Sequence, residues 1–293
     1  MTEKKYAWTA SKTIREDGKE MDLEYFTRLW REGKPAQLSG KSFWDNRAAE
    51  FNKLACQGSP DERIRKIVEF LSQNSLLTKN SSVLDIGCGP GRFAVEFAKL
   101  STDVTGLDIS DNMLDYAMKN AEAANLTNTS FKNLNWDEVN LDEFGWRKKF
   151  DLVTAINSPG IHDLITLEKM IAASKEYCFL SSFVDRYDSV QDILRTKILK
   201  LEERKFYTNN VYSILNILWL TGHYPSIVYI DTDREHIRTL EEACVYYRMF
   251  FATQDDSGNE KQELINSYLE KISVNGFVTE QVRTKTAWIH WKV

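Results

Sequence analysis

The stretch VLDIGCGPGRFAVEFAK, residues Val83 to Lys99, joins an apolar segment to a helix-like one through a loop that holds three glycines and a proline. A strand that enters a helix through such a loop leaves backbone N–H groups and the positive end of the helix at the carboxyl edge of a sheet. Open α/β sheets bind their ligands at this edge. The stretch therefore predicts a ligand-binding loop in an α/β fold.

The spacing of the glycines discriminates between ligands. A dinucleotide fingerprint needs a glycine at the position that Arg92 occupies, and the loop lacks the Gly-Lys-Ser/Thr ending of a P-loop. It reads instead Gly87-Cys88-Gly89-Pro90-Gly91, and an acidic residue, Asp85, precedes it inside the strand. NAD and ATP therefore both fit this loop poorly.

The chain around the loop alternates strands and helices. Four apolar runs read as strands, at residues 81–87, 103–110, 150–157 and 177–185. Between the second and third of these, residues 111–126 repeat apolar side chains at helical spacing. This alternation predicts a parallel sheet covered by helices on both faces. Residues 1–75 read as helices with loops, and Ser59 with Glu62 forms a capping-box pattern there.

The alternation stops after Asp185. Residues 186–253 read as an insertion with two helical stretches, an extended run and a helix opened by the capping box of Thr239 and Glu242. Residues 76–293 are thus expected to form one domain that this insertion interrupts. The last stretch, 277–293, alternates apolar and polar residues and predicts a strand pair that closes a sheet edge.

Composition and charge disfavour several classes of function. The net charge of −5 gives no general attraction for a phosphate backbone, since nucleic-acid binding rests on clustered Lys and Arg. The N-terminus lacks the apolar core of a secretory signal, and the most apolar later run, 211–220, is too short to span a bilayer. Four scattered cysteines and four scattered histidines show no metal-binding spacing and suit reduced thiols. We expect a cytoplasmic protein with no metal, no membrane segment and no nucleic-acid partner.

The loop closely resembles the first motif of class I S-adenosylmethionine-dependent methyltransferases, in which an apolar strand and an acidic residue precede G-x-G-x-G. Later segments follow the family order: VTGLDIS ends the second strand at Asp108, and FDLVTAIN forms the fourth. The resemblance covers roughly residues 81–185 and extends to the C-terminal strands. It implies a Rossmann-like, seven-stranded, mostly parallel sheet with helices on both faces and an antiparallel C-terminal strand pair. It also implies a helical N-terminal extension, residues 1–75, over the cofactor site, and a cap insertion after strand 5.

The resemblance further implies which residues hold the cofactor, S-adenosyl-L-methionine, and its product S-adenosyl-L-homocysteine. Asp108 is expected to hold the ribose hydroxyls, and the end of the third strand to frame the adenine. The expected cofactor-binding residues are Asp85, Gly87, Cys88, Gly89, Gly91, Asp108, Ile109, Ser110, Met113, Asn135, Trp136, Asn157, Trp44 and Arg47. Two of these have a second interpretation, because Trp136 also suits a protein core and Arg47, a candidate partner of the methionyl carboxylate, also suits an ordinary packing helix.

The charges agree with this ligand. S-adenosylmethionine carries an α-ammonium and a sulfonium, so the carboxylate of Asp85 beside the loop is favourable. The glycines let the backbone approach the methionyl and ribose parts closely. Cys88 is expected to pack as a small residue rather than act as a nucleophile, because no histidine is near it in the sequence.

Methyl transfer from a sulfonium is an in-line displacement, so catalysis can come from holding the reacting atoms in line in a dry site. An acceptor that loses a proton needs a base. His162 is the candidate catalytic residue, and its alternative role is that of a loop histidine. Residues Asn157-Ser158-Pro159-Gly160 resemble the Asn-Pro-Pro-aromatic motif of enzymes that methylate amide or base nitrogens, but lack the second proline and the aromatic residue. That departure speaks against base-nitrogen methylation.

The insertion is rich in aromatic residues, namely Tyr207, Tyr212, Trp219, Tyr224, Tyr229, Tyr246 and Tyr247. They suffice to line a closed pocket over a small organic acceptor, and they would equally suit a helical core or a homodimer interface. We therefore expect a methyltransferase with a small-molecule acceptor. The alternatives are an RNA or protein methyltransferase, and a non-catalytic protein that binds S-adenosylmethionine.

Overall fold

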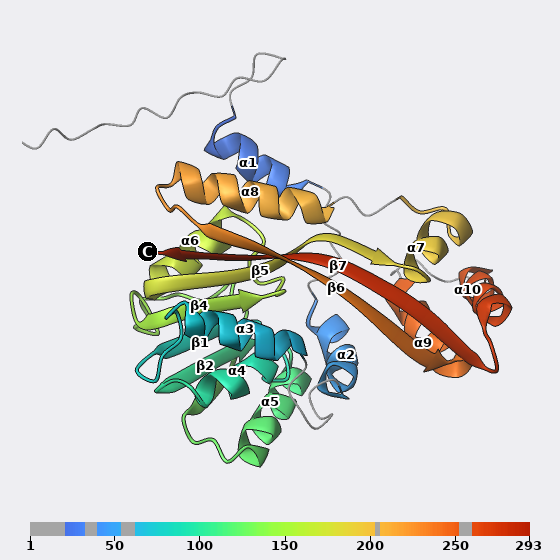
Figure 1. The fold of residues 1–293 in the computed structure, drawn as a ribbon, viewed down its shortest axis with the longest axis horizontal. Helices are drawn as coiled ribbons and strands as arrows, with labels where there is room; N and C mark the ends of the chain where they lie inside the picture. Colours follow the sequence, from blue (N-terminus) through green and yellow to red (C-terminus); the bar gives the residue numbers. More distant parts are fainter. Residues whose placement is uncertain (1–20, 33–39, 54–61, 203–205, 252–259) are drawn as a thin grey trace, which may run out of the picture. The chain divides into compact units, whose positions relative to one another are not determined.

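The computed structural model describes residues 21–32, 40–53, 62–202, 206–251 and 260–293 (Figure 1). Ser59, half of the expected capping box with Glu62, lies outside the described residues. Three helices come first, α1 (Leu23–Arg31), α2 (Lys41–Lys53) and α3 (Glu62–Gln73). Helix α1 begins at Asp22, whose side chain accepts a hydrogen bond from the backbone N–H of Tyr25 at 2.8 Å. The expected helical start of the chain is thus confirmed for the described part.

A single sheet of seven strands forms the centre of the fold, in the order β3-β2-β1-β4-β5-β7-β6. Its first five strands are β1 (Ser82–Ile86), β2 (Asp103–Asp108), β3 (Thr129–Asn133), β4 (Phe150–Ile156) and β5 (Ser174–Asp188). These five pair in parallel, with Asp85 opposite Gly106 on one side and opposite Thr154 on the other. The chain reverses its spatial direction at β1, and this switch point brings the carboxyl ends of β1, β2 and β4 together.

The remaining strands, β6 (Ser226–Thr239) and β7 (Phe277–Lys292), complete the sheet in antiparallel orientation. The Rossmann-like fold with antiparallel C-terminal strands is therefore confirmed. Residues 277–292 themselves form one long strand rather than a pair, and the strand beside it, β6, comes from the segment expected to be an insertion. Apolar side chains at alternate positions explain the continuous strand, since they keep one face of β7 in contact with the core over most of its length.

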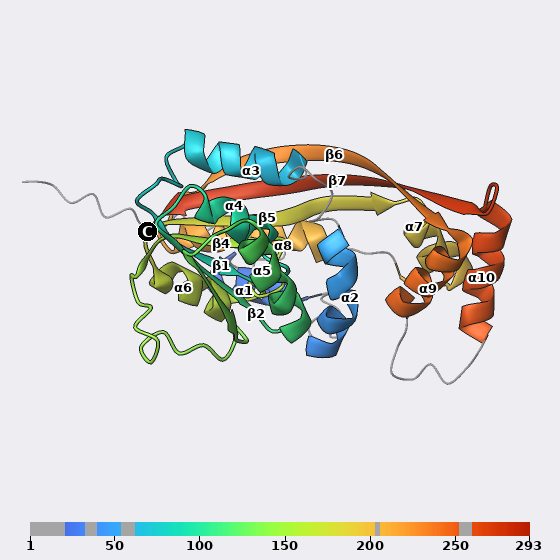
Figure 2. The ribbon, with the colours of Figure 1, turned by 90° about the horizontal axis from the view of Figure 1, so that it is seen from below.

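Helices fill the connections between the parallel strands: α4 (Arg92–Ala98), α5 (Asp111–Ala123) and α6 (Leu164–Ala173). Figures 1 and 2 show α3 and α6 on opposite faces of the sheet. Both α5 and α6 begin at side-chain caps, because Ser110 accepts from the N–H of Met113 at 3.1 Å and Asp163 from that of Thr166 at 2.9 Å. These caps set where each loop at the carboxyl edge ends.

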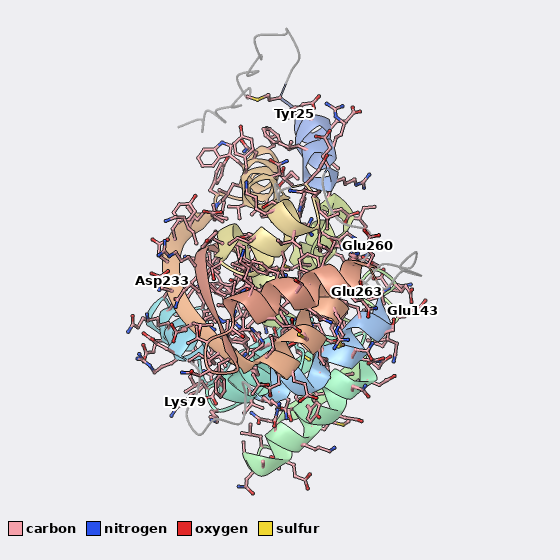
Figure 3. The ribbon with its side chains drawn as sticks, turned by 90° about the vertical axis from the view of Figure 1, so that its right-hand side faces the viewer. Tyr25, Lys79, Glu143, Asp233, Glu260 and Glu263 are labelled. Atoms are coloured by element: carbon pink, nitrogen blue, oxygen red, sulfur yellow. The ribbon has the colours of Figure 1, made fainter. Side chains whose placement is uncertain are left out.

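The last helices are α7 (Gln191–Ile193), the π-helix η1 (Leu194–Ile198), α8 (Phe206–Leu220), α9 (Leu240–Phe251) and α10 (Glu260–Ile272). The expected capping box is confirmed at α9, because Thr239 Oγ1 accepts from the N–H of Glu242 while the Glu242 carboxylate accepts from the N–H of Thr239. Figure 3 shows α10, with Glu260 and Glu263 labelled, in front of α9.

The chain divides into two compact units, and the boundary falls within β5, β6 and β7. Unit 1 comprises the described residues of Met1–Ser182, Asn209–Val228 and Trp288–Val293, and unit 2 comprises those of Phe183–Thr208 and Tyr229–Ala287. This division differs from the expected insertion at 186–253. Helix α8 belongs largely to unit 1, where Tyr212 packs edge-on against Phe26 of α1, with ring centroids 5.6 Å apart.

Unit 2 extends beyond residue 253 because α10 packs on α9 rather than returning to the parallel sheet. A core cluster of its own holds this unit together, formed by Val190, Leu194, Ala243, Tyr247, Phe251, Ile265, Leu269 and Val278. The role of residues 186–253 as a substrate cap stays a prediction that the division into units leaves untested.

Candidate active site

The glycine loop follows β1 and turns tightly against β2. The backbone N–H groups of Gly87 and Cys88 both donate to the carbonyl of Leu107, at 2.8 and 2.9 Å. Gly87, Gly89 and Gly91 all have positive φ, at 69°, 55° and 75°. A Cβ on Gly87 would lie 2.1 Å from Oγ of Ser158, and one on Gly91 would lie 2.9 Å from Cβ of Ala117. The loop therefore needs glycine for its conformation and for its close contact with neighbouring segments.

Asp108 ends β2 and binds the glycine loop directly. Its carboxylate accepts hydrogen bonds from the backbone N–H of Gly89 and from that of Ser110, both at 2.9 Å. Burial raises the pKa of Asp108, while these two N–H groups lower it. Each carboxylate oxygen can accept a further hydrogen bond, so Asp108 is a fixed, partly exposed acceptor beside the loop.

Asp85 lies one layer deeper, on β1, with 1% of its surface exposed. Oδ1 accepts from the hydroxyl of Thr154 at 2.8 Å, whereas Oδ2 is buried and has no hydrogen-bond partner among the described residues. Burial raises the pKa of Asp85 to about 7. A buried carboxylate with one unsatisfied oxygen is costly for the fold unless a donor or positive charge compensates it.

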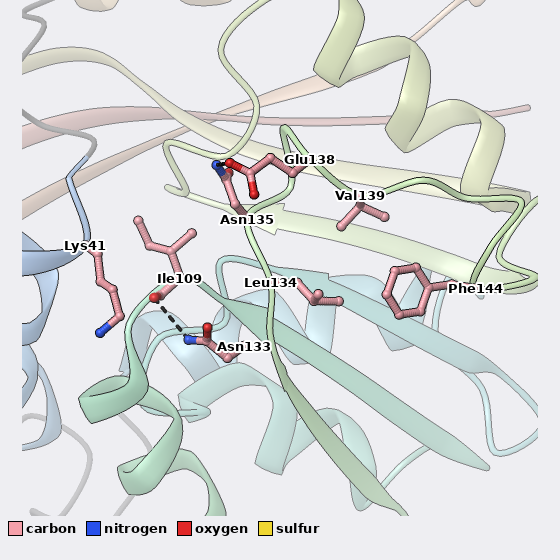
Figure 4. A pocket seen from close by; sticks show the side chains of 8 residues that line it. All are labelled: Lys41, Ile109, Asn133, Leu134, Asn135, Glu138, Val139 and Phe144. Atoms are coloured by element: carbon pink, nitrogen blue, oxygen red, sulfur yellow. Dashed lines mark hydrogen bonds between the residues drawn. The ribbon is translucent and has the colours of Figure 1, made fainter.

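A pocket of about 470 Å³ opens at the carboxyl ends of β2 and β3 (Figure 4). It is lined by Lys41, Ile109, Asn133, Leu134, Asn135, Glu138, Val139 and Phe144. Figure 4 shows polar groups on one side, where Asn133 donates to the carbonyl of Ile109 at 3.1 Å, and apolar side chains on the other. Two of the expected residues, Ile109 and Asn135, line this pocket. The other lining residues were missed, because their convergence depends on loops whose course has no motif.

Asn157 follows β4 at the same edge of the sheet and has a positive φ of 50°. With its amide oriented so that both ends are bonded, it donates to Oγ of Ser181 at 3.1 Å and accepts from Nη1 of Arg63 at 3.0 Å. The Arg63 guanidinium also lies over the ring of Phe93, 5.6 Å from its centroid. Arg63 on α3 therefore brings a positive charge to the end of β4. Nothing in the sequence distinguishes it from the other charged residues of α3.

Helix α2 is tied to the start of α5. Asp45 accepts from the hydroxyl of Ser110 at 2.6 Å, and Lys41 lies 2.8 Å from both Asp45 and Asp111. These hydrogen bonds raise the pKa of Lys41 to about 12, which keeps its ammonium charged at the edge of the pocket. The N-terminal segment is thus adjacent to the expected ribose-binding loop through Asp45, a residue that no motif in the sequence distinguishes.

The two expected residues on α2 have local partners instead. The guanidinium of Arg47 lies over the rings of Phe43 and Phe51, 5.4 and 4.9 Å from their centroids, and its Nε is 3.4 Å from Glu50. Trp44 packs edge-on against the same two rings, with a buried indole N–H that has no partner among the described residues. These contacts of Arg47 all lie within α2, as expected for the packing-helix interpretation.

Trp136 is a core residue in this structure, with 2% of its surface exposed. Its indole N–H donates to the carbonyl of Thr166 at 3.1 Å, which points the ring toward α6. It is not among the residues that line the pocket. Trp136 therefore anchors α6, and its contacts fit the interpretation of Trp136 as a core residue.

Three other expected residues pack around the loop. Met113 is buried, with its sulfur near Gly89, and Ser110 is fully buried as the cap of α5. Cys88 is buried as well, and burial raises the pKa of its thiol well above the ordinary value, so the thiol stays protonated. Cys88 therefore contributes a backbone N–H and packing rather than a reactive thiolate.

His162 lies in the loop between β4 and α6. Its Nδ1 is 3.2 Å from the carbonyl of Pro159, and its Nε2 is 3.5 Å from Asp137. Both ring nitrogens thus face protein oxygens, which orients the imidazole. Its role as a proton acceptor is a prediction.

Comparison with known proteins defines the class. A family model described as "Methyltransferase domain" matches residues 77–271, more than half of the chain. The chain therefore belongs to the methyltransferase domain family, and it is a class I S-adenosylmethionine-dependent methyltransferase. The residues present fit that cofactor: the bare loop leaves room for a close ligand, Asp108 offers acceptor sites, and the unsatisfied oxygen of Asp85 suits a positively charged neighbour.

Several proteins share parts of the sequence. An "Uncharacterized protein" of Haemophilus influenzae is 27% identical over 255 residues, which cover 85% of this chain and 88% of that protein. A ubiquinone biosynthesis O-methyltransferase of Actinobacillus pleuropneumoniae is 32% identical over 89 residues, 30% of this chain and 38% of that protein. A 23S rRNA (uracil(1939)-C(5))-methyltransferase RlmD of Aliivibrio fischeri is 37% identical over 90 residues, 29% of this chain and 20% of that protein.

Among solved structures, Phospholethanolamine N-methyltransferase 2 of Haemonchus contortus aligns with a TM-score of 0.52 at 16% identity. The alignment covers 88% of this chain and 61% of that one. The similarity is one of fold. Among the described residues, no helix is both long and apolar enough to cross a membrane.

Proposed function

We propose that the chain transfers a methyl group from S-adenosylmethionine to a small organic acceptor. The observation that carries the proposal is the Asp108 carboxylate, which accepts hydrogen bonds at 2.9 Å from the N–H groups of both Gly89 and Ser110 and directly precedes Ile109, a residue that lines the pocket. An acceptor fixed in this way is set to bind two neighbouring hydroxyls of a ribose without reorganising.

The remaining residues of the site divide by position. Gly87, Cys88, Gly89 and Gly91 form the cradle. Beneath it lies the buried carboxyl group of Asp85, which the positive charge of a bound cofactor would favour in its ionised form. Ile109 and Asn135 line the pocket on the side of Asp108, where an adenine ring would lie against apolar side chains. At the end of β4, Asn157 and Arg63 offer an amide and a guanidinium. We propose Arg63 as the partner of the methionyl carboxylate in place of Arg47, whose guanidinium lies over the ring of Phe43 within α2.

S-adenosylmethionine, when bound, supplies a methyl group on a positively charged sulfur. The chain's own contribution is to orient the reacting molecules and to exclude water. The loop Asn157-Ser158-Pro159-Gly160 is suited to excluding water. Ser158 accepts from the N–H of Gly160 at 3.1 Å and touches the glycine loop, so that the loop after β4 closes directly over the loop after β1. Such packing favours a dry site for in-line displacement.

Charge supports a small-molecule acceptor. The net charge is −5, whereas a methyltransferase that grips an RNA backbone needs clustered basic side chains. The similarity to the RNA methyltransferase of Aliivibrio fischeri spans 90 residues, 20% of that protein, and so leaves most of its length unmatched. The loop after β4 also lacks the second proline and the aromatic residue associated with base-nitrogen methylation.

A labelling experiment tests the proposal. The purified chain is incubated with methyl-tritiated S-adenosylmethionine and either a low-molecular-mass cell extract or unmodified ribosomal RNA. We expect label in the small-molecule fraction, strongly reduced in Asp108→Ala. Label in RNA alone would show that the acceptor is RNA rather than a small molecule. A third incubation uses a protein extract as the acceptor. Binding of S-adenosylhomocysteine with no transfer to small molecules, RNA or protein would support a non-catalytic binding protein instead.

Two further expectations accompany the proposal. The described cysteines Cys88, Cys178 and Cys244 are free thiols, which supports a reducing compartment such as the cytoplasm. Association as a homodimer is a prediction that light scattering on the purified protein will test.

A further inference from the structure

The carboxyl group of Asp85, two residues before the glycine loop, is buried without a compensating charge. Its Oδ2 has no hydrogen-bond partner among the described residues, and Oδ1 accepts from a neutral hydroxyl. Within the described part of the chain, the titratable groups that act on it are Asp108 at the end of β2 and the Cys88 thiol in the loop, and neither carries positive charge. Such an environment keeps the proton on a carboxyl group until a cation arrives.

Thr154, opposite Asp85 on β4, is placed to serve both protonation states of that group. Its Oγ1 lies 2.8 Å from Oδ1 of Asp85 and 3.3 Å from the carbonyl oxygen of Leu84. A hydroxyl has one hydrogen to donate, but its lone pairs can also accept. Protonated Asp85 can donate to Oγ1 while the hydroxyl donates to Leu84, and ionised Asp85 can receive the hydroxyl hydrogen instead. Rotation of one O–H bond therefore connects the two states.

The two states of Asp85 lie close in free energy near neutral pH. Burial raises the pKa of Asp85 to about 7, the hydrogen bond from Thr154 opposes this rise, and the charge of Asp108 adds to it. Thr154 is itself fully buried, so the arrangement lies in a poorly solvated part of the sheet, where charges interact strongly. A positive charge bound on the glycine loop, whose bare backbone adds little thickness, would therefore favour the ionised state.

We propose that Asp85 releases its proton when S-adenosylmethionine binds, and that Thr154 is the positioning residue that supports the carboxyl group before and after this release. The inference rests on the proposed function, which supplies the positively charged ligand. The O–H bond of the carboxyl group breaks, its electron pair stays on Asp85, and the proton passes to the buffer. The buried carboxylate is then compensated by the charge of the cofactor.

The coupling between binding and protonation has a definite sign. Asp85 is ionised in the complex, so its pKa there lies below that of the free protein. Between these two pKa values one proton leaves for each cofactor bound, and the affinity rises about tenfold per pH unit. Above the pKa of the free protein, about 7, this group contributes no further pH dependence.

Titration calorimetry with S-adenosylmethionine counts the proton. The titration is repeated in buffers of different ionisation enthalpy, and the slope of the measured enthalpy against the buffer enthalpy gives the number of protons released. We expect about one proton per cofactor near pH 6 and almost none near pH 8. Binding near pH 6 without proton release would overturn the proposal.

Two further ligands show which positive charge Asp85 responds to. S-adenosylhomocysteine lacks the sulfonium but keeps the α-ammonium, and adenosine lacks both. Release with S-adenosylhomocysteine as well would assign the effect to the ammonium, whereas release with S-adenosylmethionine alone would assign it to the sulfonium. Adenosine should bind without releasing a proton. Equal release with adenosine would overturn the proposal, since occupation of the site rather than charge would then be the cause.

Substitutions separate the roles of the two residues. Asp85→Asn should release no proton near pH 6 and should lose the rise in affinity between about pH 5 and pH 7. Thr154→Val removes the donor to the ionised carboxylate, so proton release should persist near pH 8 and the Kd near pH 7 should rise about tenfold. Thr154→Ser keeps the hydroxyl and should restore both values. A normal pH profile in Thr154→Val would contradict the positioning role.

The matched control is Asp151→Asn, on the same strand as Thr154. The carboxylate of Asp151 lies 2.8 Å from Lys175 and accepts from the hydroxyl of Ser82, and although burial opposes them these hydrogen bonds hold its pKa below the ordinary value. It is therefore already ionised in the free protein. The number of protons released should stay the same in this variant, and an equal loss there would show that the effect does not belong to Asp85.

Infrared spectroscopy provides a measurement on the wild-type protein that needs no variant. In a difference spectrum near pH 6, the C=O stretch of a protonated carboxyl group should disappear when S-adenosylmethionine is added. Cofactor binding that leaves this band unchanged would overturn the inference and leave the methyltransferase intact. Failure to bind either S-adenosylmethionine or S-adenosylhomocysteine at any pH would overturn the proposed function instead.

Discussion

The carboxylate of Asp45, on α2, accepts a hydrogen bond from the hydroxyl of Ser110 at 2.6 Å. Ser110 follows Asp108 by two residues, donates its own N–H to that carboxylate, and caps α5. One residue thus connects the N-terminal helix to the loop proposed to hold the ribose. This connection explains how a helix distant in sequence can influence the cofactor site.

Substitution of Asp45 with alanine should therefore destabilise the site. Ser110 is fully buried, so its hydroxyl would lose an acceptor in a place that water does not reach, at a cost of about 1–3 kcal/mol of unfolding free energy. Urea denaturation measures this loss, and calorimetry should show weaker binding of S-adenosylhomocysteine. Glu50→Ala removes an equivalent charge from the same helix and should change stability by about 0.5 kcal/mol at most. Equal effects of the two variants would contradict the assigned role.

Asp108→Ala tests the ribose assignment. The lost carboxylate should cost roughly 2–4 kcal/mol of cofactor affinity, since each hydrogen bond to a charged group contributes about 1.5–3 kcal/mol and water compensates in part. Titration calorimetry with S-adenosylhomocysteine would then show a Kd raised about 30- to 900-fold. Asp115→Ala, on the exposed side of α5, is the control for charge. A folded Asp108→Ala protein that binds within threefold of wild type would refute the assignment.

Gly87→Ala separates backbone strain from the close contact at the loop. Gly145 also has a positive φ, 60°, but a Cβ there would meet nothing within 4 Å. Gly145→Ala should therefore cost about 1–2 kcal/mol of stability from strain alone, without affecting the cofactor. Gly87→Ala adds a clash with Ser158 and should lose more stability, together with binding of S-adenosylhomocysteine. Thermal unfolding and calorimetry on both variants provide the comparison.

Asp85 predicts a specific dependence of stability on pH. Burial raises its pKa from the ordinary value of 3.8 to about 7, so between these values the unfolded state ionises the group while the folded state keeps the proton. Its contribution to stability is therefore complete below about pH 4 and is lost as the pH rises toward 7, at about 1.4 kcal/mol per unit.

Comparison with Asp85→Asn isolates this effect, because all other groups titrate in both proteins. The difference in unfolding free energy between wild type and variant should change by about 2–3 kcal/mol from pH 5 to pH 7, in favour of the variant at the higher pH. Urea denaturation at intermediate pH values follows the change. A difference that is constant with pH would mean that Asp85 is ionised in the folded protein.

Arg63→Gln and Arg47→Gln decide which arginine serves the methionyl end. Arg63 contacts Asn157 at the carboxyl end of β4, whereas the contacts of Arg47 lie within α2. We expect Arg63→Gln to raise the Kd for S-adenosylhomocysteine at least tenfold and Arg47→Gln to leave it within threefold, with circular dichroism as the check on folding. The reverse order would restore the assignment made from the sequence.

The sequence by itself determined the parallel part of the sheet and the nature of its ligand edge. Three closely spaced glycines after an acidic strand require positive φ and a close approach, and these are local properties that a few residues encode. The same holds for the caps of α9 and for the acidic end of β2. A short stretch was therefore sufficient to indicate the class of enzyme.

Only the tertiary structure decided which distant side chains meet at the candidate site and which residues form the second unit. Arg63 of α3 and Asn157 after β4 are 94 positions apart and meet only in the folded chain, a contact that no local pattern encodes. Trp136 lies in the core rather than in the pocket, because its indole N–H donates to the carbonyl of Thr166. Helix α10 packs on α9, and apolar residues of both helices share one core cluster. The periodicity of a helix predicts that it has an apolar face, but long-range packing decides which element covers that face.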